Sequence, residues 1–76
     1  MRADEPDEIS LPLAEREVRE SEDRVAWQFC LVLALERDGA WQEAQAARRV
    51  LTGFQDRLGL AWERLQMERW VHDHKR

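Results

Sequence analysis

The chain of 76 residues has few residues that cross-link a small fold or interrupt its helices. It contains one cysteine, three glycines and two prolines, and it has no tyrosine. A single cysteine excludes a disulfide within the chain. We therefore expect Cys30, inside the run "WQFCLVLAL", to be a small core residue in a reducing compartment. The longest purely apolar run, "FCLVLAL", is far shorter than a bilayer span requires.

Targeting signals are also missing from the sequence. The first residues, "MRADEPDEIS", are acidic and lack the apolar segment of a signal peptide. We therefore expect a cytoplasmic protein with no membrane segment. The strong bias toward arginine over lysine indicates a GC-rich coding sequence, which favours a bacterial or phage origin.

The acidic residues are concentrated at one end of the chain. The net charge is −4. Residues 1–24 hold nine acids and four arginines, whereas residues 25–76 hold seven acids and eight bases. An acidic first third followed by a near-neutral remainder disfavours duplex DNA as the main partner.

The hydrophobic pattern predicts one helical domain at residues 11–76 after a flexible acidic tail at residues 1–10. Ser10 is expected to cap a helix over residues 11–38. Its apolar positions recur every seven residues, at Leu11, Val18, Val25 and Val32, with Ala26, Phe29 and Leu33 widening the stripe.

A turn is predicted at residues 39–40, because Gly39 suits the left-handed position that ends a helix. A second helix is expected over residues 41–72. Gly59, in "RLGL", leaves open whether this helix continues, bends or breaks, and the unchanged phase across it favours continuity. Three- and four-residue steps mark the seam of this helix at Ala44, Ala47, Leu51, Phe54, Leu58, Ala61 and Leu65.

The fold class is therefore all-α, an antiparallel helical hairpin. The segment "LGLAWERLQMERW" carries apolar residues on nearly all sides, more than the first half of helix 11–38 can cover. Two hairpins forming a four-helix bundle as a homodimer would cover this excess. The alternative is a monomeric three-helix bundle in which residues 60–74 fold back over the apolar run.

The segment "LALERDGAWQEAQAARRVL" resembles the turn and second helix of a single tetratricopeptide repeat, with Gly39, Trp41 and Ala44 at matching positions. Arg48 departs from the pattern, which prefers an aromatic residue there. One repeat cannot form a solenoid. The resemblance implies a helical hairpin and protein binding.

No pattern in the chain predicts an enzyme or a cofactor. The hydroxyl side chains and Cys30 have no neighbouring base, and the glycines are isolated. Glu68 and His72 have a spacing that can hold a metal, but no second cluster completes a site. We expect neither catalysis nor metal binding.

We therefore predict a small protein-binding regulator, adaptor or inhibitor that forms a homodimer. Its partner is another protein, held through an apolar helix surface. Nucleic-acid binding by arginines of the second half is the alternative, as is an acidic mimic of nucleic acid that blocks a nucleic-acid-binding protein. The predicted contact residues are Trp62, Leu65, Met67, Trp70, Trp41, Arg64 and Arg69.

Overall fold

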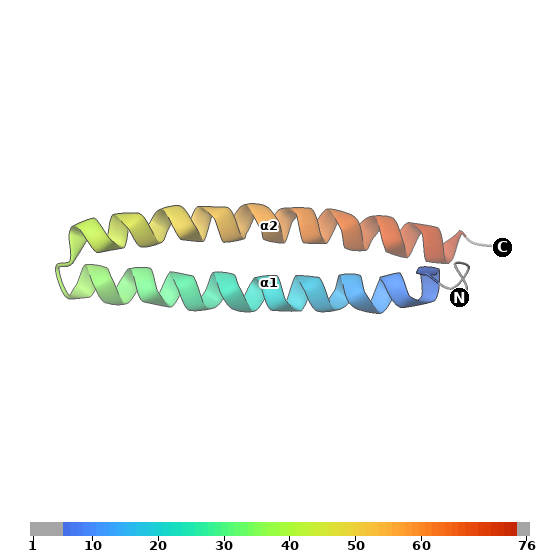
Figure 1. Ribbon diagram of the computed structural model, residues 1–76, viewed down its shortest axis with the longest axis horizontal. Helices are drawn as coiled ribbons and strands as arrows, with labels where there is room; N and C mark the ends of the chain where they lie inside the picture. Colours follow the sequence, from blue (N-terminus) through green and yellow to red (C-terminus); the bar gives the residue numbers. More distant parts are fainter. Residues whose placement is uncertain (1–5, 75–76) are drawn as a thin grey trace.

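The computed structural model is a hairpin of two long, antiparallel helices (Figure 1). It describes the backbone of residues 6–74 and the side chains of residues 11–74. Helix α1 spans Pro6–Arg37 and helix α2 spans Trp41–Asp73. Each helix is about 50 Å long, because an α-helix rises ~1.5 Å per residue. The predicted all-α hairpin is confirmed.

Helix α1 begins five residues earlier than predicted, at Pro6 instead of Leu11. Ser10 therefore lies inside the helix and is not its cap. The first helical position suits proline, because the missing N–H would have no partner there and the ring fixes φ near its helical value. Of the predicted tail, residues 1–5 lie outside the described residues.

The turn follows the prediction for Gly39, which has a φ of 78°. The Gly39 N–H donates to the Glu36 carbonyl at 3.0 Å, and the Ala40 N–H donates to the Leu35 carbonyl at 2.9 Å. These two bonds form a Schellman motif, which satisfies carbonyls that a helix end leaves free. Only three residues connect the helices, so α2 must return antiparallel beside α1.

The two helices meet along a seam with the alternating three- and four-residue spacing of a coiled coil. On α1 every seam residue is buried or half-buried: Leu11, Ala14, Val18, Ser21, Val25, Gln28, Val32 and Leu35. The same holds on α2 for Ala44, Ala47, Leu51, Phe54, Leu58, Ala61, Leu65 and Glu68. The predicted α2 seam and the seven-residue repeat of α1 are therefore confirmed.

The predicted widening of the α1 stripe is wrong. Phe29 is 51% exposed and Leu33 is 43% exposed. Ala26 and Cys30 are also exposed, so Cys30 is not a core residue. Residues 26–35 are apolar on every side of the helix, so their own composition cannot choose a buried face. The buried face is fixed instead by the three- and four-residue spacing of the seam, which continues without a shift from Leu11 to Leu35.

Helix α2 runs unbroken through both of its glycines, which confirms continuity at Gly59. The alternative three-helix bundle is therefore wrong. Gly53 and Gly59 both lie on the exposed side of α2, away from the seam. A glycine inside a helix lowers its stability by about 1 kcal/mol relative to alanine. The packing of the neighbouring seam residues Leu58 and Ala61 against α1 offsets this cost.

The seam itself is thin. Its buried residues are mainly alanine and valine, and Leu65 is the largest buried side chain among residues 11–74. Half-buried Gln28 donates from Nε2 to the Ala47 carbonyl at 3.0 Å, which satisfies one polar group between the helices. Neither helix of the described part is long and apolar enough to cross a bilayer.

Candidate functional site

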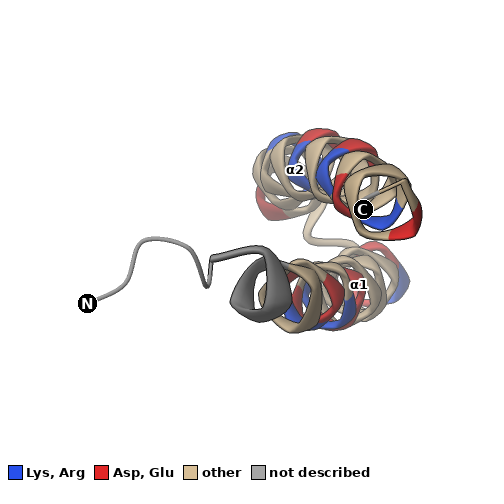
Figure 2. Cartoon of the chain, turned by 90° about the vertical axis from the view of Figure 1, so that its right-hand side faces the viewer, with Lys and Arg blue, Asp and Glu red and all other residues tan. Residues whose placement is uncertain are grey.

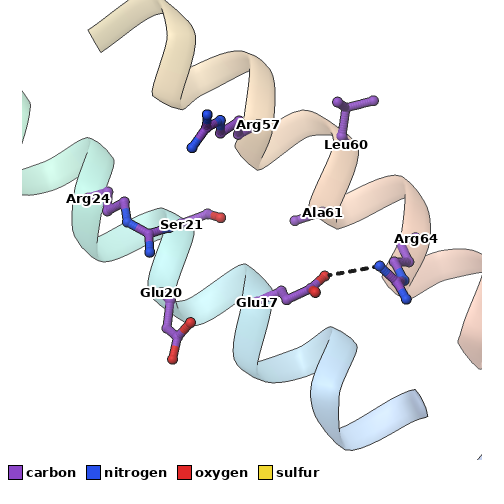
Figure 3. A pocket seen from close by; sticks show the side chains of 8 residues that line it. All are labelled: Glu17, Glu20, Ser21, Arg24, Arg57, Leu60, Ala61 and Arg64. Atoms are coloured by element: carbon purple, nitrogen blue, oxygen red, sulfur yellow. Dashed lines mark ion pairs between the residues drawn. The ribbon is translucent and has the colours of Figure 1, made fainter. Parts of the chain in front are cut away.

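The hairpin has two long flanks, one on either side of the seam, and each is grooved. We call the first the Arg57 flank. Its central groove is lined from α1 by Glu17, Glu20, Ser21 and Arg24, and from α2 by Arg57, Leu60, Ala61 and Arg64. Figure 3 shows Ser21 and Ala61 pointing toward each other between the helices and Arg57 extending toward α1.

The Arg57 flank continues toward both ends of the hairpin with apolar side chains. Residues three, four or seven apart share one face of a helix, so they extend the rows that line the groove. These residues are Leu13, Trp27, Leu31, Val50, Met67 and Val71. Beside Trp27 and Leu31 lies a smaller hollow, which is also lined by Gln28. The flank therefore has an apolar end, a charged centre and a second apolar end.

We call the other side of the hairpin the Trp62 flank. Its groove is lined by Glu15, Val18, Arg19, Glu22, Trp62, Leu65 and Arg69. By the same spacing rule, this side continues toward the turn with Phe29 and Leu33 on α1 and with Trp41 on α2. Trp62 is 38% exposed, so part of the indole packs on the hairpin and part remains accessible.

Charged groups are spread over the whole surface. Arg64 pairs with Glu17 across the Arg57 flank at 3.7 Å, and Arg48 pairs with Glu36 on the Trp62 flank. Figure 2 shows basic and acidic residues interspersed along both helices of the described part. Such interspersed charge weakens attraction to a phosphate backbone, which needs clustered cations.

Exposed apolar side chains are the unusual feature of this surface. Twelve large ones are exposed among residues 11–74, and Trp27 is the most exposed of them at 78%. Seven of the twelve lie on the Arg57 flank: Leu13, Trp27, Leu31, Val50, Leu60, Met67 and Val71. Large apolar side chains gathered on one flank are typical of interaction sites, whereas single exposed apolar residues are common on any protein surface.

The structure divides the predicted contact residues between different surfaces. Trp62 and Arg69 line one groove, and Arg64 lines the other. Met67 is 64% exposed on the Arg57 flank. Trp41 is 62% exposed beside the turn, about 30 Å along α2 from Trp62. It does not share a patch with Trp62.

Leu65 belongs to the core of the hairpin. It is 2% exposed and clusters with Ala14, Val18 and Ala61. In this fold Leu65 stabilises the groove in which Trp62 lies, and it is not accessible to a partner. Leu65 and Trp62 are only three residues apart, but Leu65 faces the seam and Trp62 lies beside it.

Trp70 lies at the outer edge of α2, near the end of the helix, and is 59% exposed. Its indole stacks on the His74 ring with the centroids 4.1 Å apart, and His74 Nδ1 lies 2.8 Å from the Trp70 carbonyl. His74 thereby occupies the end of α2. Among the described residues, no three histidine, cysteine or acidic side chains gather as a metal site would require.

The exposed apolar residues Trp27 and Leu31, near the turn, are not among the predicted contact residues, because the predicted stripe of this helix places Phe29 and Leu33 at the buried face. The signal that identifies them is the seam spacing. Once Val25, Gln28, Val32 and Leu35 are placed at the seam, Trp27 and Leu31 must point outward on one flank.

No protein-family model, curated protein or solved structure matches this chain. Its function must therefore be inferred from the geometry of the hairpin.

Proposed function

We propose that this protein is a small, non-enzymatic binding module that regulates, links or inhibits another protein. It works as a homodimer in which two hairpins form a four-helix bundle. The observation that carries the proposal is the contrast between a seam whose buried residues are mostly small and twelve large apolar side chains left exposed among residues 11–74.

Thermodynamics supports association. A 76-residue chain is near the size at which a single core becomes marginal. An isolated pair of helices buries each helix on one side only, and this seam buries mostly small residues. A second hairpin packed on an apolar flank would remove further apolar surface from water, and each Å² of it stabilises the dimer by ~25 cal/mol.

The proposed partner surface is the end of α2 that carries Trp62, Arg69 and Trp70. Tryptophan and arginine dominate the energetics of protein interfaces, since both combine large contact area with directional polar groups. Trp62 stands at the wall of a groove lined by Arg69, Glu15 and Glu22, so a partner helix would meet an aromatic anchor with charges of both signs at its rim.

The test compares proteins retained from a lysate of the source cells by the wild-type chain and by the Trp62→Ala/Trp70→Ala double variant. Trp41→Ala, a matched tryptophan substitution about 30 Å along α2 from Trp62, is the control. We expect at least one protein to be retained by wild type and by the control but not by the double variant. Calorimetry with that purified protein should reproduce the difference.

Equal retention by all three proteins would contradict the proposed surface. The same samples are treated with nuclease and washed at increasing salt concentration. Retention that needs nucleic acid and falls steeply with salt would support the nucleic-acid alternative instead.

A further inference from the structure

We propose that two hairpins pack through their Arg57 flanks, side by side with both turns at the same end of the bundle. The inference rests on the proposed self-association and names the face and the orientation. It goes further in assigning Trp27, which the expected contact set did not include, to this interface. The occupant of this flank is therefore a second copy of the chain.

The distribution and the area of the apolar surface favour this face. Seven of the twelve exposed large apolar side chains lie on this flank, Leu60 within its charged centre and the other six on either side of it. Two helices about 50 Å long and ~10 Å wide present roughly 1,000 Å² on one flank. A stable interface needs about 800 Å² from each partner. The flank is large enough to form one.

Charge complementarity between the two helices selects the orientation. In the groove, α1 contributes Glu17, Glu20 and Arg24, and α2 contributes Arg57 and Arg64. The α1 side is therefore net acidic and the α2 side basic. A two-fold axis parallel to the helices places α1 of one copy against α2 of the other, acid against base. Placing the two copies head to tail would put α2 on α2, with arginines facing arginines.

A large residue and a small residue also face each other in this orientation. Trp27 lies thirteen residues before Ala40, and Gly53 lies thirteen residues after it, both on the Arg57 flank. With both turns at the same end, Trp27 of each copy meets Gly53 of the other. A Cβ built on Gly53 has nothing within 4 Å, so the glycine leaves open space for an indole.

This arrangement leaves the Trp62 flank and Trp70 facing outward. The two-fold axis then presents two copies of the proposed partner surface on opposite sides of the bundle. A dimer of this kind binds two partner molecules, or two sites on one partner, and gains affinity from both contacts.

The experiment measures the dimer dissociation constant by sedimentation equilibrium for wild type and four single variants. Trp27→Ala should raise it about thirtyfold, the cost of truncating a buried tryptophan hot spot, whereas Trp41→Ala should leave it unchanged. Gly53→Leu should raise it at least about tenfold by filling the space for Trp27. Gly59→Leu is the matched control, since its Cβ also meets nothing but it lies outside the Arg57 flank.

Orientation is measured on the wild-type chain with a nitroxide label on Cys30, the only cysteine and an exposed one. Helices 8–10 Å apart with both turns at one end give a label separation of about 20–25 Å. In a head-to-tail pair centred on the groove, the two labels lie about twenty residues apart along the bundle, which gives a separation of at least ~30 Å.

A dimer that survives Trp27→Ala, or a label separation above ~30 Å, would overturn this interface and leave the proposed function standing. A wild-type chain that stays monomeric would overturn the self-association as well. Partner binding by Trp62 and Trp70 is tested separately, so the two failures can be told apart.

Discussion

Replacing Leu65 by alanine should destabilise the hairpin more than any change on its surface. Leu65 is 2% exposed and packs against Ala14, Val18 and Ala61. Removing its distal carbons costs about 2.4 kcal/mol in transfer free energy, at ~0.8 kcal/mol per methylene. Its neighbours are too small to refill the space, although the adjacent groove lets Trp62 shift. We therefore expect a loss of about 2–3 kcal/mol, the low end for such substitutions.

The assay is urea and thermal unfolding, followed by helical circular dichroism at one fixed protein concentration, because association is linked to stability. A chain of this size has roughly 4–11 kcal/mol in total, so Leu65→Ala removes a large fraction of it. The midpoint temperature should fall by about 10–20 °C. Leu33→Ala is the matched leucine control, since Leu33 is 43% exposed, and it should cost below ~1 kcal/mol. Equal losses for the two variants would refute the assigned seam.

Three further predictions concern the backbone, the thiol and an ion pair. Gly59→Ala should stabilise by about 0.5–1 kcal/mol, since its Cβ meets nothing, whereas Gly39→Ala should destabilise by about 1 kcal/mol because φ there is +78°. Urea unfolding measures the change in the free energy of unfolding for both variants. Changes of the same sign would contradict the left-handed conformation assigned to Gly39. Cys30 should react with a thiol reagent in the native protein as fast as in urea; strong native protection would place it back in a core. Arg48→Ala, which breaks the partly exposed pair with Glu36, should cost below ~1 kcal/mol; a larger loss would show that the pair is more than a surface contact.

Local rules were sufficient for the turn and for α2. Gly39 is the left-handed residue of a Schellman motif, and that motif depends only on nearby residues. The α2 seam was predictable because alanine, leucine and phenylalanine keep strict steps between polar neighbours, even across Gly59. The same regularity made the continuous helix predictable.

Helix α1 was harder to predict, for two physical reasons. Its seam includes Ser21 and Gln28, so a search for apolar positions misses these two layers. Its second half is apolar all round, so hydrophobicity cannot choose between Val32 at the seam and Phe29 or Leu33 outside. The structure makes this choice by continuing the phase of the first half. Once that rule is applied, the outward direction of Trp27 follows.

The seam also explains why so much apolar surface is left over. Counting equal steps from the turn pairs Leu35 with Ala44, Val32 with Ala47, Ser21 with Leu58 and Ala14 with Leu65. In each of these layers a larger side chain faces a smaller one, which fixes the alignment of the helices and lets them approach closely. Close approach buries little side-chain surface per layer. A hairpin built this way gains a defined shape from its seam, and we propose that association through its flanks supplies further stability.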